Sequence, residues 1–317
     1  MVGNEHSGGR EGIALNRTSD GSVVRWLLGP SHHGMTLGSA VLDPDGLLVS
    51  YSSGPACTSG IAGCGPEDGT CSSEIDRYDV RAGTFTRLVK AGSARLVGNA
   101  HLSPDGRYLA YTESPCVPSY FNDHLRVLDL QTWSSWTIGA DLPRCHYLGL
   151  QAWTLDSARL LVDYAPARGA DYHGADGICP ESGKQHLKVV DALSGQPGVR
   201  GLTEPTHRGC ELQSAAPDGS GVLAVEACGK DDYLDGRVWL ARFDAALHRT
   251  GRVLLGRCTD GNEVAANRAR TRWLISAYLY CGDPADPKTK VWTYNGAHLR
   301  HVVTRKGGDL MYSDLAW

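Results

Sequence analysis

The sequence has no run approaching the roughly 20 apolar residues that cross a bilayer as a helix, so we expect no membrane span in this chain. It also has no large excess of one charge. Its formal net charge of −4 is modest and negative, which argues against a nucleic-acid partner. Apolar residues nevertheless make up 41% of the 317 residues, enough for a folded core.

Several catalytic and metal-binding motifs are also missing. The sequence has no G-x-S-x-G nucleophile elbow, and no P-loop or G-x-G-x-x-G follows a predicted strand. Neither C-x-x-C nor H-x₃-H spacing occurs, which argues against zinc ribbons and thioredoxin-like redox sites. We therefore predict no catalytic residue, no metal ligand and no cofactor from motifs, and an enzyme is the less favoured class.

The N-terminal residues 1–12 are polar and glycine-rich, and we expect a flexible segment there. They lack the apolar core of a secretory signal. Either the protein stays in the cytoplasm, or an export or anchor segment has been removed from its N-terminus. Residues 13–317 are expected to form a single domain, because no Pro/Ser-rich linker interrupts them.

A repeated unit runs through those residues. The segments 40–51 (AVLDPDGLLVSY) and 100–111 (AHLSPDGRYLAY) share a Pro-Asp-Gly turn between two apolar runs, which predicts a β-hairpin. Degenerate copies begin at Ala152, Ser214 and Ala265. Two further strand-like runs follow the hairpin in each copy, and four antiparallel strands about every 50 to 60 residues describe a propeller blade.

The fold class predicted is therefore all-β, a β-propeller of six blades with four antiparallel strands each. The sixth blade is expected to be composite, with outer strands at 12–17 and 23–28 and an inner strand at 311–317. Such a blade joins the two ends of the chain and protects the sheet edges. Its second strand is not obvious, so five or seven blades are alternatives.

The segment 103–111 (SPDGRYLAY) resembles the PD40 (WD40-like) repeat of TolB-type propellers. The resemblance extends over almost the whole chain through the degenerate copies, and it implies a TolB-like β-propeller. Proteins similar to TolB usually carry an N-terminal α/β domain, and this sequence shows none.

The ten cysteines predict disulfides, because that number is even and high for a cytosolic chain of this size. Six of them fall at equivalent places in three repeats, 29, 31 and 30 residues apart. We predict three blade-to-blade bridges: Cys116–Cys145, Cys179–Cys210 and Cys228–Cys258. The alternative is that regular blades space free thiols regularly.

The other four cysteines are Cys57, Cys64, Cys71 and Cys281. The first three share a predicted loop from Ser53 to Glu74. One bridge inside that loop and a link from the third cysteine to Cys281 are the pairing we expect. Metal binding by the three loop cysteines is the alternative.

The face that carries the predicted bridges also gathers polar residues at the ends of the inner strands. Repeat alignment puts Asn99, Glu263 and Asp314 at one position and Glu211 one residue earlier, while His146 lies in a loop that leads into the next blade. These residues are candidates for an acidic pocket that binds a cationic group, a Ca²⁺ ion or a peptide. Alternatively, they hydrogen-bond neighbouring blades, or His146 forms a zinc site with His33 and His207.

Aromatic residues divide into two groups. Tyr120, Phe121 and Tyr172 lie in predicted loops of that face and are candidates to contact a sugar or a peptide. Six tryptophans lie in predicted strands, and we expect most of them in the core between blades: Trp133, Trp136, Trp153, Trp239, Trp273 and Trp292.

The favoured function is a non-catalytic binding or scaffold module, secreted or otherwise extracytoplasmic, that recognises a protein, peptide or glycan. The alternatives are a hydrolase or lyase with carboxylates at the channel mouth, such as Glu211, Glu263 and Asp314, and a purely structural interaction domain.

Overall fold

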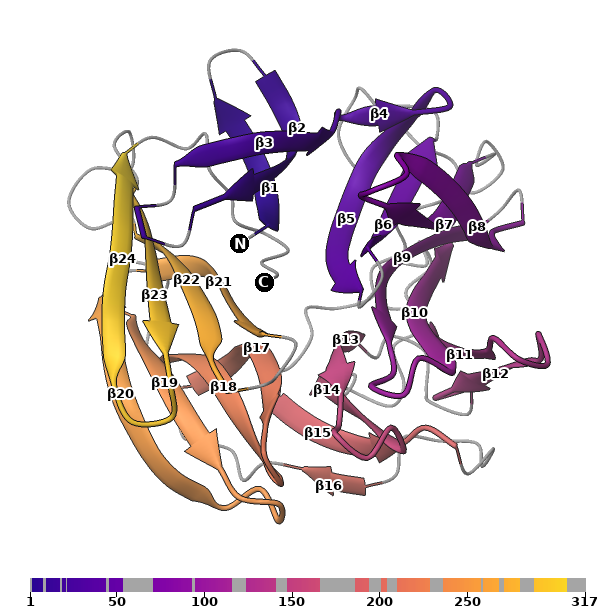
Figure 1. The fold of residues 1–317 in the computed structure, drawn as a ribbon. Helices are drawn as coiled ribbons and strands as arrows, with labels where there is room; N and C mark the ends of the chain where they lie inside the picture. Colours follow the sequence, from indigo (N-terminus) through magenta and orange to yellow (C-terminus); the bar gives the residue numbers. More distant parts are fainter. Residues whose placement is uncertain are drawn as a thin grey trace, which may run out of the picture. The chain divides into compact units, whose positions relative to one another are not determined.

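The structure is a computed structural model, in which the described residues form strands and turns (Figure 1). It describes residues 2–7, 10–17, 19–20, 22–43, 46–53, 71–92, 95–115, 124–140, 147–165, 186–193, 201–203, 210–228, 236–257, 259–267, 271–279 and 288–306. Within these ranges, no helix is long and apolar enough to cross a membrane.

The chain divides into two compact units. The first unit consists of residues Ser31–Gln185 and Val190–Gly201, and the second of Met1–Pro30, His186–Val189 and Leu202–Trp317.

Two sheets lie wholly in the first unit. One has the order β4-β5-β6-β7-β8, and its strands are β4 (Ser31–His32), β5 (Met35–Asp43), β6 (Gly46–Ser53), β7 (Ser72–Asp79) and β8 (Thr84–Lys90). The other has the order β9-β10-β11-β12, and its strands are β9 (Arg95–Leu102), β10 (Tyr108–Pro115), β11 (His124–Asp129) and β12 (Ser135–Ile138). A third sheet, β13-β14-β15-β16, begins in this unit and comprises β13 (Tyr147–Trp153), β14 (Arg159–Ala165), β15 (His186–Asp191) and β16 (Gly201–Thr203).

The second unit holds two further four-stranded sheets and one of three strands. The first of them comprises β17 (Cys210–Asp218), β18 (Gly221–Cys228), β19 (Arg237–Phe243) and β20 (Arg249–Arg257). The next comprises β21 (Thr259–Ala266), β22 (Trp273–Leu279), β23 (Lys288–Tyr294) and β24 (Leu299–Lys306). The three-stranded sheet comprises β1 (Val2–Ser7), β2 (Arg10–Asn16) and β3 (Val23–Leu28).

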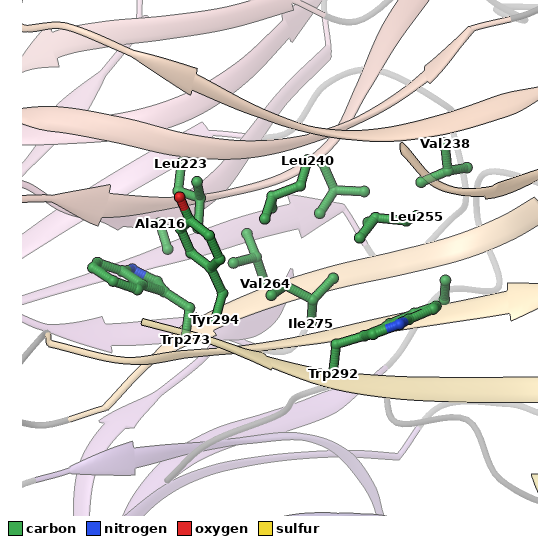
Figure 2. Close-up of a cluster of buried hydrophobic side chains, with 12 residues drawn as sticks. Ala216, Leu223, Val238, Leu240, Leu255, Val264, Trp273, Ile275, Trp292 and Tyr294 are labelled. Atoms are coloured by element: carbon green, nitrogen blue, oxygen red, sulfur yellow. The ribbon is translucent and has the colours of Figure 1, made fainter. Parts of the chain in front are cut away.

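Apolar side chains join neighbouring sheets inside each unit. In the second unit, Leu223 and Leu240 of one sheet pack against Trp273, Ile275 and Tyr294 of the next (Figure 2). Equivalent cores join β4–β8 to β9–β12, and β9–β12 to β13–β15, in the first unit. Sheets of consecutive strands packed face to face are blades, and the chain is a β-propeller as predicted, with five sheets of four or five strands.

The repeated hairpins close as their sequences predict. The backbone N–H of Ser103 donates to the carbonyl of Tyr108, and Gly106 between them has a φ of 75°, which glycine adopts without strain. The equivalent backbone bond closes two of the degenerate copies, from Thr154 to Arg159 and from Asn267 to Arg272. A β-bulge also interrupts the first strand of the repeated hairpin in each of these five sheets, on β5, β9, β13, β17 and β21, a regularity that the sequence did not reveal.

The N-terminal segment differs from the prediction. Val2–Ser7 is strand β1, paired antiparallel with β2 from Val2 opposite Leu15 to Ser7 opposite Arg10, where no strand was predicted; the flexibility expected for residues 1–12 stays a prediction. The two outer strands predicted for the composite blade are present as β2 and β3. The inner strand predicted at 311–317 lies outside the described residues, and the single domain predicted for 13–317 stays a prediction.

The disulfide pattern also requires a correction. Cys210 is bonded to Cys228, with Cα atoms 3.9 Å apart, so the predicted Cys179–Cys210 and Cys228–Cys258 bridges are wrong. The reason is register: Cys210 begins β17 and Cys228 ends β18, and the two residues lie directly opposite each other. Cys71 is also disulfide-bonded. Cys57, Cys64, Cys281 and both members of the Cys116–Cys145 bridge lie outside the described residues.

Candidate functional site

Three of the predicted pocket residues lie in described strands: Asn99 on β9, Glu211 on β17 and Glu263 on β21. The Nδ2 group of Asn99 donates to the carbonyl of Leu150 on β13 at 2.6 Å, so Asn99 links two neighbouring blades. This is the role that the structural alternative gives to inner-strand polar residues. Glu211 accepts a hydrogen bond from Gln213 at 3.2 Å.

Glu211 and Glu263 lie on the first strands of two packed sheets of the second unit, whereas Asn99 belongs to the first unit. The other candidates lie outside the described residues: Asp314, His146, Tyr120, Phe121 and Tyr172. The proposed pocket as a whole therefore stays a prediction.

The structure brings together a different set of ionisable residues, all in the sheet β4–β8. We call it the carboxylate cluster, and it consists of His32, His33, Tyr51, Glu74, Asp76 and Arg87. It arises from strand alternation. Leu48 and Ile75 face the neighbouring sheet β9–β12, so Tyr51, Glu74 and Asp76 point to the opposite face.

The two carboxylates of the cluster are almost completely buried. Glu74 is 2% exposed and Asp76 1% exposed. Arg87 forms an ion pair with Glu74, and its Nε lies 3.7 Å from Oδ1 of Asp76. The Nδ1 of His33 lies 3.6 Å from Oε1 of Glu74. A single arginine thus faces two buried carboxylates.

This arrangement shifts the pKa values of the cluster. Burial, and then the negative charge of Glu74, raise the pKa of Asp76 to about 6, although Arg87 opposes the shift. Burial and the neighbouring His33 lower the pKa of His32. Burial also raises the pKa of Tyr51, with a smaller contribution from Asp76.

The imidazole ring of His32 packs against two neighbouring rings. Its ring centroid lies 4.0 Å from that of Phe85 and 3.7 Å from that of His33. Three buried atoms of the cluster have no hydrogen-bond partner among the described residues: Nε2 of His32, Oε1 of Glu74 and Oδ1 of Asp76. The cluster can hold a shared proton between its carboxylates, and a perturbed pKa of this kind marks a candidate functional site.

The sequence carries a signal for this cluster. Residues 72–79 (SSEIDRYD) place two acidic residues two positions apart, which puts both on one face of a strand. The loop predicted from Ser53 to Glu74 instead ends at this residue, so the prediction leaves Glu74 outside the strand. In the described part of the chain, no group of three or more His, Cys, Asp or Glu residues is arranged to hold a metal ion.

A second candidate lies on the turn between β11 and β12. Trp133, which was expected in a strand and in the core, is 60% exposed and has a φ of 58°. Trp153 and Trp273 are buried as predicted, and their indole N–H groups donate to the carbonyls of His101 and Pro217. The prediction is therefore wrong for Trp133.

The turn that carries Trp133 is held firmly by Asp129. The Asp129 carboxylate accepts hydrogen bonds from the backbone N–H of Gln131 and from the side chain of Arg107, at 2.8 Å each. The hydrogen bond from Arg107 is the main reason that the pKa of Asp129 falls to about 2. The N–H of Trp133 donates to the carbonyl of Asp129 at 2.7 Å. A large aromatic side chain is thus held in solvent on a left-handed backbone, which costs free energy.

No model of a protein family matches this sequence, and no curated protein matches it either. Solved structures are similar at low identity. A structure described as TolB from Agrobacterium tumefaciens is 15% identical with a TM-score of 0.54, over 92% of this chain and 88% of that chain. Prolyl oligopeptidase B from Galerina marginata is 11% identical with a TM-score of 0.53, over 96% of this chain and 40% of that chain.

The acylaminoacyl peptidase of Pyrococcus horikoshii is 16% identical with a TM-score of 0.49, over 85% of this chain. This chain spans only about two fifths of the length of these two peptidases, 39% of the acylaminoacyl peptidase and 40% of the oligopeptidase. At these identities the similarities to TolB and to prolyl oligopeptidase B show the β-propeller fold alone.

Proposed function

We propose that this chain is a TolB-like propeller module that works outside the cytoplasm and binds a protein, peptide or glycan without catalysis. The similarity to TolB over most of both chains supports the propeller part of this proposal. The Cys210–Cys228 disulfide and the disulfide-bonded Cys71 support an oxidising compartment. Because a propeller fold serves many functions, the binding role must be argued from side chains.

The observation that carries the binding role is the exposed Trp133. A tryptophan at this position exposes apolar surface and occupies a backbone conformation that bulky residues avoid, so it does not serve the stability of the turn. Tryptophan is also enriched among the residues that anchor interfaces. The hydroxyl groups of Thr132 and Ser134, 2.7 Å apart, provide polar contacts beside the ring.

The residues predicted from sequence extend this proposal. Tyr120, Phe121 and Tyr172 are further candidates for contact with a peptide or sugar, and Asn99, His146, Glu211, Glu263 and Asp314 for a polar pocket. A Ca²⁺ ion on the carboxylates of that pocket is part of the proposal. Replacing Glu263 and Asp314 with glutamine and asparagine would remove a calcium-dependent increase in melting temperature if the ion binds there.

Trp133→Gly tests the binding role. Glycine adopts positive φ without strain, so we expect the variant to be as stable as the parent or more stable, by about 1 kcal/mol. The same change should abolish ligand binding. Binding is measured by thermal shift and tryptophan fluorescence with sets of peptides, glycan fragments and divalent cations, with and without reductant. Leu193→Ala, which removes another exposed apolar side chain, is the control. A ligand that binds equally well to Trp133→Gly would contradict this role of Trp133.

A hydrolase or lyase is the second candidate. The similarity to prolyl oligopeptidase B is one of fold, but Asp76 beside Glu74 has the raised pKa of a carboxyl group that can donate a proton near neutral pH. Peptidase and glycosidase substrates should be tested with the same preparation. Turnover that is lost in Asp76→Asn, or in Glu211→Gln combined with Glu263→Gln, would favour this candidate over the binding module.

A further inference from the structure

The outer strands of the second unit are unusually basic. Two Lys or Arg residues lie in β19, three in β20, two in β23 and three in β24, ten in all, and these four strands contain no Asp or Glu. The whole chain has a net charge of −4. We call these four strands the basic edge, and its ten residues are Arg237, Arg242, Arg249, Arg252, Arg257, Lys288, Lys290, Arg300, Arg305 and Lys306.

Part of this charge is neutralised inside the blade. Arg242 forms an ion pair with Asp218 on β17 at 2.5 Å, and Arg249 with Glu226 on β18 at 2.6 Å. Arg237, Arg252 and Arg300 are exposed, and no acidic side chain of the described residues pairs with them. Arg252 lies over the ring of Trp239, 4.2 Å from its centroid, which fixes its guanidinium at the surface.

The basic edge also contains two long strands with an open side. β20 and β24 are the last strands of neighbouring sheets (Figure 1), and no described strand is hydrogen-bonded to their outer sides. β20 has nine residues and β24 has eight, whereas the last strands β8, β12 and β16 of the other four- and five-stranded sheets have seven, four and three. Short edge strands prevent unwanted pairing, and a long exposed one invites it.

The exposed side chains of β20 show what kind of strand fits. Val253 and Leu254 are 42% and 43% exposed beside the exposed Arg252. A second copy of the chain would bring a strand of the same positive charge, which is repelled. A polyanion without apolar groups would leave Val253 and Leu254 in water. An extended acidic peptide with apolar residues can do three things at once. Its carboxylates pair with the arginines, its apolar side chains cover exposed apolar side chains of β20, and its backbone hydrogen-bonds to the open side of that strand.

We propose that the basic edge binds an extended, acidic protein segment, which adds to β20 as a further strand, with its acidic side chains on the face of Arg252 and its apolar side chains on the opposite face beside Val253. The basic edge lies on strands of the second unit, whereas Trp133 lies on the turn between β11 and β12 of the first unit. The two proposals can therefore fail independently.

The probe is a fluorescent nine-residue peptide of alternating Glu and Val, followed by anisotropy at low and high salt. We expect binding that salt weakens, because the charges are exposed. Arg252→Glu together with Arg300→Glu should weaken binding about tenfold or more, as loss of charge complementarity does at interfaces. Arg81→Glu together with Lys90→Glu makes the same change of net charge at the two ends of β8, and it should leave binding unchanged.

Three further measurements decide what binds. A peptide of alternating Lys and Val should not bind. The Glu-Val peptide with alternate backbone nitrogens methylated should bind much more weakly, because it cannot pair with β20. Equal binding of the methylated peptide would overturn strand addition, and binding of heparin but not of the Glu-Val peptide would overturn the proposal in favour of a polyanion surface. Trp133→Gly should bind the peptide normally, and the melting temperature of each variant checks that it is folded.

Discussion

Among single residues, Asp76 shows most clearly how burial controls protonation. Its pKa of about 6 lies above that of an ordinary carboxyl group, so the folded protein binds a proton there that the unfolded chain has released. A raised carboxyl pKa means that stability from this group is greatest at acid pH and falls as the pH rises from about 4 through 6. His32, with a lowered pKa, acts in the opposite sense, and its contribution falls as the solution becomes acidic.

Asp76→Asn isolates this effect, because asparagine is uncharged and can donate to Glu74 as protonated aspartate does. We expect the variant to gain about 1–3 kcal/mol in free energy of unfolding relative to the parent between pH 5 and pH 7.5. Urea unfolding at the two pH values measures this. Asp79→Asn on the same strand is the control. Backbone hydrogen bonds lower the pKa of Asp79, so its variant should not gain stability as the pH rises. A pH-independent difference for Asp76→Asn would show that Asp76 is charged throughout.

At the scale of strands, the register of β17 and β18 determines the disulfide. The separation of 18 residues between Cys210 and Cys228 closes a loop whose chain entropy corresponds to about 3 kcal/mol. We expect Cys210→Ser with Cys228→Ser to lose about this much stability. Chemical unfolding of the double variant and the parent, both without reductant, measures it.

Mass mapping of the non-reduced protein checks the pairing itself. It should recover a peptide with Cys210 joined to Cys228. A peptide that joins Cys210 to Cys179 would restore the pairing predicted from sequence. The equal spacing of the cysteines was a real consequence of the repeat. The spacing did not identify the disulfide partners, because a bridge within one hairpin and a bridge between neighbouring blades are both compatible with cysteines that recur once per blade.

For the whole molecule, the repeat in the sequence predicts one cooperative domain. The boundary between the two compact units falls inside β15, after Val189, so neither unit is a set of complete strands. We therefore expect a single thermal transition with equal calorimetric and van't Hoff enthalpies. Two separate transitions in scanning calorimetry would instead show that the units fold independently.

Much of the fold could be read from local sequence. The Pro-Asp-Gly turns, the apolar runs beside them and the recurrence of both predict the hairpins and the propeller, because turn chemistry and strand alternation act over a few residues. Strand β1 was missed even though Gly8 and Gly9 separate Ser7 from Arg10, a spacing typical of a two-residue hairpin.

The sequence by itself determined that the chain is all-β and that its unit is a four-stranded hairpin repeat, since both follow from interactions between near neighbours. The tertiary structure alone decided which cysteines pair, that Glu74 and Asp76 share one arginine, that Trp133 faces solvent and that the basic strands β19, β20, β23 and β24 are the outer strands of two neighbouring sheets. These properties depend on register, on which face of each strand is covered and on charges contributed by distant segments, and none of them is encoded within a single repeat.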